Sequence, residues 1–496
     1  MTTRSRAGYP LAVALVVLGL CPYVVVTTAF APLADLVARD LHASAQAVQL
    51  AGGLGNAAYA VGAVVAAQLG QRFVQRRLFL VYTPVIVVAT LVAGLAGDGL
   101  VFTIGRTAEG FAAGAMLISS LPVLLTRFGS GRVPVSAAVV NVGMFGASAL
   151  GPVVGGLVAG TEDWRAFFVV VAVLEALAWG AALAGFVRFD PPDPERPFDV
   201  QAVFWVVVAT TLLFTGTSLL TGHAFVSWPV LLPLAGGLVA LALLFVVEER
   251  QEQPLIPLRE LASQLPVTGT MAAMVGGAVF VGALQLVQLE QADVVRRGPE
   301  AVAWLFWPTP IGAVVAAVLL GVLVRTAYLP LLVDAGLLAL AAAPALLLAL
   351  GSGRPVVLVA AALLGFGAGA TVSPGLFLTG FGLPATQLGR AFAMVQLLRS
   401  LATYAVAPVV LHLAQSRGDL AAGVDDALVV LLVLAAVGLA AAVLLPFFSG
   451  ARLRRPDLEG WLDGGQALPS PTLAVHLRPG TEDDDAAPLL PGGEPP

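Results

Sequence analysis

Long apolar runs separated by short polar segments fill the first 448 residues of the chain. A helix crosses the hydrocarbon core of a bilayer with about 20 apolar residues, and most of these runs have that length. The pattern predicts an all-α polytopic membrane protein whose fourteen spans lie at residues 10–31, 47–69, 78–96, 99–124, 135–158, 165–187, 201–221, 229–248, 265–288, 301–324, 328–350, 355–377, 388–412 and 425–448.

Polar segments divide these spans into groups. The stretch 189–200 is rich in proline and acids, which is typical of a linker. The last residues are rich in proline, glycine and acids, a composition that favours disorder. We therefore predict four parts: an N-terminal six-helix bundle at 1–190, a linker with two extra spans at 191–250, a C-terminal six-helix bundle at 251–448, and a disordered cytoplasmic tail at 449–496.

The arginines predict the orientation of the chain. With the N-terminus inside, sixteen arginines lie in the cytoplasmic segments and six lie on the opposite side. Cytoplasmic loops of membrane proteins carry the excess of positive charge. The bias supports an even number of spans, with both termini cytoplasmic.

Composition excludes several classes of function. The chain is 58% hydrophobic and 11% charged, whereas soluble domains carry about 25% charged residues. It contains no lysine, so a phosphate-binding G-x-x-x-x-G-K-[ST] loop and a Schiff-base lysine are both impossible. Cys21 is the single cysteine and the four histidines are scattered, so no metal site is predicted. No basic stripe indicates nucleic-acid binding.

A ridge of small residues runs along the predicted fifth span. Gly143, Ala147, Gly151 and Gly155 recur at every fourth position, which places them on one helix face and lets another helix approach closely. Pro152 predicts a bend in that helix. We expect the ridge to lie between two bundles that rock against each other and to close their interface; a plain helix-packing face is the alternative.

Several motifs around this ridge resemble those of the Major Facilitator Superfamily, in particular its fourteen-span branch of drug:proton antiporters. The segment G-P-V-V-G-G at 151–156 resembles the antiporter motif of that family, and the W-R pair at 164–165 resembles the entry to its sixth span. Further matches are the R-x-x-x-G pattern in span four and the basic loop after span two. Trp228 and the segments E-E-R at 248–250 and P-L-I at 254–256 are similar to elements of the fourteen-span branch. The matched positions are Gly151, Pro152, Gly155, Gly156, Trp164, Arg165, Arg106 and Gly110, with Gln71, Arg72, Arg76 and Arg77 in the loop as gating candidates.

The resemblance implies a secondary active transporter of the plasma membrane. Such a protein exports lipophilic or amphipathic small molecules, as in multidrug efflux, by rocking of its two bundles in exchange for protons. It needs no cofactor beyond the proton gradient, works as a monomer in the bilayer, and carries the two extra spans at its periphery. The match has departures: Ala67, Gln71 and Val74 replace the usual glycine, aspartate and second glycine of the loop, and the first span has no central acid.

The departures keep other functions open. An uncoupled facilitator, or an exporter of lipids or metabolites with the same fold, is the main alternative. A membrane-embedded enzyme would need a His, Cys or acid cluster that the sequence does not show. A scaffold protein without transport is a further alternative.

Charges deep inside the spans are the candidate functional residues, because a charge near the bilayer centre costs roughly 2.5–3.5 kcal/mol. Glu175 has no evident local partner, so we predict it as the proton carrier. Glu109 is the second candidate, and Arg106 lies three residues before it on the same face. A structural hydrogen bond or a buried structural ion pair is the alternative for each acid. Four residues are candidates for the cavity wall: Asn141, Phe145, Gln285 and Arg399.

Overall fold

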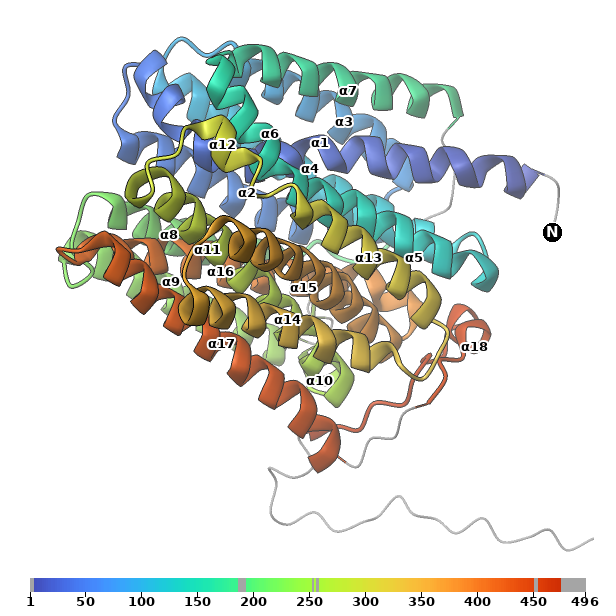
Figure 1. The fold of residues 1–496 in the computed structure, drawn as a ribbon. Helices are drawn as coiled ribbons and strands as arrows, with labels where there is room; N and C mark the ends of the chain where they lie inside the picture. Colours follow the sequence, from blue (N-terminus) through green and yellow to red (C-terminus); the bar gives the residue numbers. More distant parts are fainter. Residues whose placement is uncertain (1–3, 186–192, 252–253, 256–257, 450–453, 474–496) are drawn as a thin grey trace, which may run out of the picture.

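The computed structural model describes residues 4–185, 193–251, 254–255, 258–449 and 454–473. Fourteen helices of this part of the chain are long and apolar enough to span a membrane, and they run roughly side by side (Figure 1). Each predicted span overlaps one of them, so the predicted number and order of spans are confirmed. Within the described ranges no strand occurs beyond an isolated bridge between Ser263 and Thr472.

The helices of the N-terminal half and the extra pair are α1 (Arg4–Asp40), α2 (Ala45–Arg72), α3 (Gln75–Gly94), α4 (Gly99–Thr126), η1 (Ser130–Arg132), α5 (Val133–Asn141), η2 (Val142–Gly146), α6 (Ala147–Thr161), α7 (Trp164–Gly185), α8 (Val200–Ser218), η3 (Leu219–Thr221) and α9 (Trp228–Arg250). Those of the C-terminal half are α10 (Leu258–Leu261), α11 (Gln264–Leu289), η4 (Glu290–Val294), α12 (Pro299–Ala303), α13 (Pro308–Leu323), α14 (Leu329–Leu350), α15 (Arg354–Phe381), η5 (Ala385–Gln387), α16 (Leu388–Ser416), α17 (Leu420–Phe448) and α18 (Leu458–Leu462).

The helices pack in two groups, α1–α7 and α11–α17, with close contacts inside each group. Small residues permit these contacts. A Cβ added at Gly110 of α4 would collide with the backbone of Gly55 in α2, and one at Gly114 would collide with Tyr59. Gly365 of α15 faces the backbone of Thr309 in α13 in the same way. Because lipid is as apolar as the helix surfaces, the hydrophobic effect does not hold helices together in a membrane. Close van der Waals contact at small residues stabilises their association instead.

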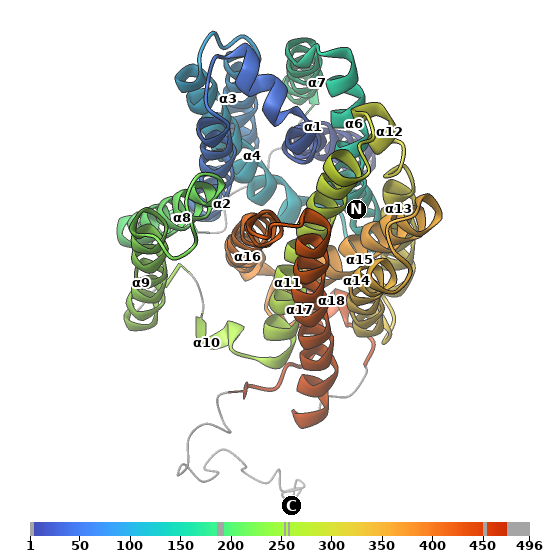
Figure 2. The same cartoon turned by 60° about the vertical axis from the view of Figure 1, so that its left-hand side comes forward.

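The extra pair α8–α9 lies beside α2 and α16 at the edge of the molecule (Figure 2). Gln68 of α2 fixes the start of α8 through two hydrogen bonds, donating to the Asp199 carbonyl at 3.2 Å and accepting from the Asp199 amide at 2.6 Å. At the other end, Phe214 packs against Tyr404 of α16 with ring centres 5.8 Å apart. Helix α8 therefore contacts both helix groups along one line where they meet.

The predicted ridge of span five contacts α1, which belongs to the same helix group. A Cβ at Gly143 would meet Cys21 and Val17, and one at Gly151 would collide with Thr28. The close approach is as expected, but the expectation that this ridge closes the interface between the two groups is wrong. The opposite face meets the other group instead: a Cβ at Gly156 would lie 2.7 Å from Ala303 of α12.

The geometry of span five also changes before Pro152. Residues Val142–Gly146 form a π-helix, which inserts one residue into the α-helical turn. The carbonyl of Gly143 accepts a hydrogen bond of 2.8 Å from the thiol of Cys21. The departure from regular α-helix thus begins about three turns before the proline that the sequence indicated.

The predicted disorder of 449–496 is wrong for residues 454–473, which pack against the C-terminal half. Trp461 of α18 is 1% exposed, and its indole N–H donates to the carbonyls of Gly380 at 3.2 Å and Leu383 at 3.0 Å. Backbone hydrogen bonds join Leu468 to Phe381 and Gln264 to Pro471. A buried aromatic side chain and paired backbone groups outweigh the polar composition here. Residues 450–453 and 474–496 lie outside the described residues.

A central cavity beside a buried charge network

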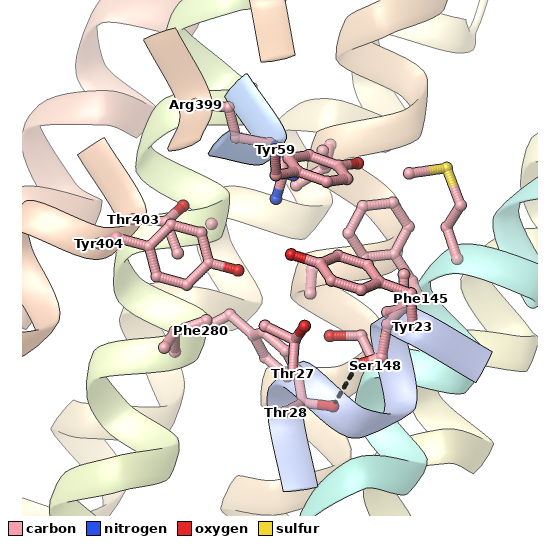
Figure 3. Close-up of a pocket in the computed structure, with 16 residues that line it drawn as sticks. Tyr23, Thr27, Thr28, Tyr59, Phe145, Ser148, Phe280, Arg399, Thr403 and Tyr404 are labelled. Carbon is pink, nitrogen blue, oxygen red and sulfur yellow. Dashed lines mark hydrogen bonds between the residues drawn. The ribbon is translucent and has the colours of Figure 1, made fainter. Parts of the chain in front are cut away.

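A small cavity lies between the two helix groups (Figure 3). Tyr23, Tyr59 and Arg399 of its lining lie near the middle of their helices. Its wall is built by α1, α2, η2 and α6 from one group and by α11, α15 and α16 from the other. About 50 Å³ of it is open to the centres of water molecules, enough for a few waters at roughly 10–15 Å³ each. A larger molecule therefore needs the two groups to move apart before it can bind.

Three tyrosines give the wall both apolar surface and hydrogen-bonding groups. Tyr23 of α1 and Tyr59 of α2 stack with ring centres 5.5 Å apart, and Tyr404 of α16 lines the same space (Figure 3). Phe145 is the one aromatic residue that the sequence indicated for the cavity wall, so these tyrosines were not predicted. A tyrosine in the middle of a span was the available signal, because tyrosine in membrane proteins is enriched at the interfaces.

Arg399 of α16 brings a positive charge to the wall. Its Nε donates to the Gln396 side chain at 2.9 Å, and Gln396 in turn donates to the Tyr59 hydroxyl at 3.0 Å. This chain of two hydrogen bonds joins α16 to α2 across the two helix groups. Among the described residues that line the cavity, Arg399 alone carries a full charge.

A charge network lies directly behind the tyrosine wall in the first helix group. Arg106 and Glu109 of α4 form a salt bridge, and their side chains are 2% and 0% exposed. The guanidinium carbon of Arg106 lies 5.8 Å from the centre of the Tyr23 ring, and Nη2 lies 3.5 Å from the Thr27 hydroxyl. Tyr23 and Thr27 both line the cavity. Arg106 therefore touches the cavity wall on one side and an acid on the other.

Glu175 of α7 belongs to this network, so the expectation that it has no local partner is wrong. It is fully buried, and Oε2 accepts a hydrogen bond of 2.9 Å from the Thr90 hydroxyl of α3. The Glu175 and Glu109 carboxyls interact electrostatically, and Thr90 also interacts with Glu109. Oε1 of each acid is buried without a hydrogen-bond partner among the described residues.

The charge balance of this network is uneven. Two carboxyl groups share the single guanidinium of Arg106, so one negative charge stays uncompensated when both acids are ionised. An uncompensated buried charge is costly, and one bound proton neutralises it. The network can therefore hold a proton on either acid, with the Thr90 hydroxyl between them.

The remaining motif residues make structural contacts near the ends of the spans. The Trp164 indole donates to Asp40 at 2.9 Å, and Arg165 donates to the carbonyls of Gly94 at 3.2 Å and Ala96 at 2.7 Å. These bonds join the start of α7 to the ends of α1 and α3. Gly110 permits the α2–α4 contact described above.

The predicted gating loop lies at the junction of α2 and α3. The carbonyl of Gln71 accepts a hydrogen bond of 3.0 Å from the Asp193 amide in the linker, and Arg76 donates to the Leu183 carbonyl at 3.3 Å. Arg72 is half-buried and Arg77 is exposed. The structure places this loop against the linker and the end of α7.

The four cavity candidates fall in different places. Phe145 and Arg399 line the cavity. Asn141 lies outside its lining and donates to the Gly369 carbonyl of α15 at 2.9 Å, which joins the two helix groups. Gln285 is half-buried in α11 and is not among the described residues that line the cavity.

Comparison with known proteins decides the family. The family model described as Major Facilitator Superfamily matches residues 16–408. The chain belongs to the Major Facilitator Superfamily. This member has fourteen candidate spans in its described residues, and membership makes it a membrane transporter rather than an enzyme.

Relatives of this superfamily member include proteins named for export. The drug efflux pump JefA of Mycobacterium tuberculosis is 28% identical over 344 residues, which are 68% of this chain and 66% of that protein. The tetracenomycin C resistance and export protein of Streptomyces glaucescens is 30% identical over 268 residues, 53% of this chain and 49% of that protein. The matches thus span between half and two thirds of the length of these relatives.

Solved structures show the same fold. The human organic anion transporter MFSD10 (TETRAN) aligns with a TM-score of 0.61 at 14% identity, covering 88% of this chain and 99% of that one. A POT family transporter crystallised with 5-aminolevulinic acid aligns with a TM-score of 0.63 at 13% identity, covering 89% and 96%.

Proposed function

We propose that this transporter exports lipophilic or amphipathic small molecules in exchange for protons. The single observation that carries the proposal is the position of Arg106, which contacts Glu109 on one side and the Tyr23 ring of the cavity wall on the other. The names of the two relatives, a drug efflux pump and an export protein, support export as the direction.

Proton binding and cargo binding are coupled through Arg106 in this proposal. When Glu109 and Glu175 are both ionised, the attraction on Arg106 is strongest; a proton on either acid weakens it. A change in the position of Arg106 reaches Tyr23 and Thr27, because both lie against its guanidinium. The cavity wall therefore responds to the protonation of the network, and the two helix groups rock about the cavity between its two openings.

The experiment uses the full chain in proteoliposomes with an imposed pH gradient and amphipathic dyes of both charges. Glu175→Gln removes the titrating group and keeps the shape of the side chain. We expect proton-driven flux to fall at least about a hundredfold, the lower end of the contribution of a proton-transfer group, while dye exchange without a gradient persists. The matched control is Glu249→Gln, an exposed acid at the end of α9. Unchanged gradient dependence in Glu175→Gln would exclude this acid as the carrier.

An uncoupled facilitator, or an exporter of lipids or metabolites, is the second candidate. Gln71 in place of the usual aspartate and the lack of a central acid in the first span favour it. Under this alternative the wild-type dye flux depends on the concentration gradient of the dye alone. An imposed pH gradient does not change it in the same vesicles.

We infer that the transporter lies in the plasma membrane with both termini in the cytoplasm. The described start of α1 and the helix α18 lie at the same end of the molecule (Figure 1), which fits an even number of spans. A monomer is sufficient, because one chain builds the whole cavity. In a Cys21→Ser background, Gly97→Cys should react with an impermeant thiol reagent in intact cells, whereas Glu459→Cys should not. Reaction of Glu459→Cys in intact cells would show that the tail faces the outside and that the inferred orientation is wrong.

A further inference from the structure

We propose that the cargo is an aromatic organic anion whose negative group binds Arg399. The inference rests on the proposed export function and adds the chemical class of the substrate. It starts from the charge of the central cavity, to which the described lining residues contribute one guanidinium and no carboxylate.

Arg399 lacks a countercharge of its own. Among the described residues none of the salt bridges includes it, and its Nε donates a hydrogen bond to the neutral Gln396 side chain. The guanidinium also interacts with the Tyr59 hydroxyl, so its described neighbours at the cavity wall are neutral groups (Figure 3). A guanidinium presents a fork of donors that matches a carboxylate or a sulfonate. A bound anion would supply the charge that this half-buried cation lacks.

The wall around Arg399 also carries hydroxyl groups that can donate to an anion. The Tyr23 hydroxyl and the Thr403 hydroxyl are buried without a hydrogen-bond partner among the described residues, and both residues line the cavity. A buried hydroxyl without a partner is uncommon, and a ligand oxygen would satisfy it. Donors from α1 and α16 thus face the same space from opposite helix groups.

The charge network behind the wall does not remove the preference of the cavity for an anion. Glu109 is paired with Arg106, so the pair adds no net charge beside Tyr23. Glu175 lies farther back and binds Thr90 rather than a residue of the cavity wall. Aromatic faces at Tyr23, Tyr59 and Phe280 attract cations in general, but a cation here would lie beside an uncompensated guanidinium in a poorly hydrated space. The same faces can stack on the aromatic body of an anion.

The test compares two probes that share a naphthalene ring and carry opposite fixed charges, naphthalene-2-sulfonate and 2-naphthylmethyl-trimethylammonium. Neither probe titrates near neutral pH, so an imposed pH gradient acts only through the protein. Binding is measured by naphthalene fluorescence with the full chain in detergent, and flux is measured in proteoliposomes against protein-free vesicles. We expect the sulfonate to bind at least about tenfold tighter, as for a charge-assisted hydrogen bond.

Three variants make the result specific to Arg399. Arg399→Gln should lose sulfonate binding at least about tenfold, and Arg399→Lys should recover part of it, because the charge returns without the fork. Arg354→Gln is the matched control, an exposed arginine at the start of α15. Thermal unfolding of each variant shows whether it is folded.

The outcomes separate this inference from the proposed function. Arg399-dependent sulfonate binding without proton-driven flux would support the anion site and reject proton-coupled export. Proton-driven flux of the ammonium probe that increases in Arg399→Gln would support export and overturn the anion inference. Failure of the sulfonate to bind the folded wild-type chain would also overturn it.

Discussion

At the scale of single residues, the proposed proton coupling rests on a few polar groups that meet behind the cavity wall. Thr90 is the least obvious of them in the sequence, since a threonine inside an apolar span usually bonds to its own helix. Here its hydroxyl donates to Glu175 of another helix at 2.9 Å. In the proposed mechanism it is a positioning residue, because it contacts the acid and not the cargo.

Replacing Thr90 should therefore change proton coupling more than folding. We expect Thr90→Val to leave Glu175 without a donor, which costs about 1–3 kcal/mol for a buried group, and to displace the pH dependence of transport by about one pH unit or more. Thr90→Ser keeps the hydroxyl and should restore the wild-type profile. Thr83→Val is the control, since Thr83 lies on the same helix and bonds mainly to the Phe79 carbonyl. An identical pH profile for Thr90→Val and wild type would contradict this role.

At the scale of elements, span five is held against α1 by its small residues. Helix α1 carries the cavity residues Tyr23, Thr27 and Thr28, so the α1–α6 contact sets the position of one cavity wall. The ridge thus acts on the cavity through its own helix group.

Gly151→Leu should push α1 away from α6, because even a Cβ at this position would collide with Thr28. Overpacking costs typically about 1–3 kcal/mol, and we expect a lower melting temperature together with loss of flux. Gly180→Leu is the matched control: Gly180 is exposed on α7, and a Cβ there meets nothing within 4 Å. Normal flux in well-expressed Gly151→Leu would show that the ridge contact is dispensable.

The segment 457–473 is a second element whose role follows from packing. Trp461→Ala removes a buried indole that bonds to two carbonyls of the α15 end, and truncating a buried tryptophan costs about 3–5 kcal/mol. We expect this segment to detach while the spans stay folded, with faster hydrogen exchange in 262–265 and 457–473. Glu459→Ala, an exposed neighbour on α18, should leave exchange unchanged. Slow exchange in Trp461→Ala would mean that other contacts hold the segment.

At the scale of the whole molecule, the proposed exchange moves net charge. One proton inward and one anion outward transfer two positive charges toward the inside per cycle, and a membrane potential contributes about 2.3 kcal/mol per charge per 100 mV. A transporter with this stoichiometry draws on the potential as well as on the pH gradient.

Sulfonate export should therefore accelerate when the side that loses the anion is made negative with a potassium gradient and valinomycin. In Glu175→Gln only the charge of the anion moves, so the dependence on potential should fall to about half of the wild-type value. Vesicles without an imposed potential are the baseline. A wild-type sulfonate flux that does not change with the membrane potential would exclude this stoichiometry.

The sequence by itself determined the class of the protein and its span layout. Fourteen apolar runs of bilayer length suffice for this, because in lipid each helix satisfies its own backbone hydrogen bonds and its length is a local property. The acids Glu109 and Glu175 and the cavity arginine Arg399 were also visible, since a charge inside a span stands out against apolar neighbours.

Only the tertiary structure decided which of these residues meet. Glu175 reaches Thr90 across 85 positions of the chain, and Gln396 reaches Tyr59 across 337. The docking of Trp461 and the contact of the small-residue ridge with α1 are likewise contacts between distant segments. Helix periodicity defines the faces of each span, but the partner of each face depends on how all the helices pack together.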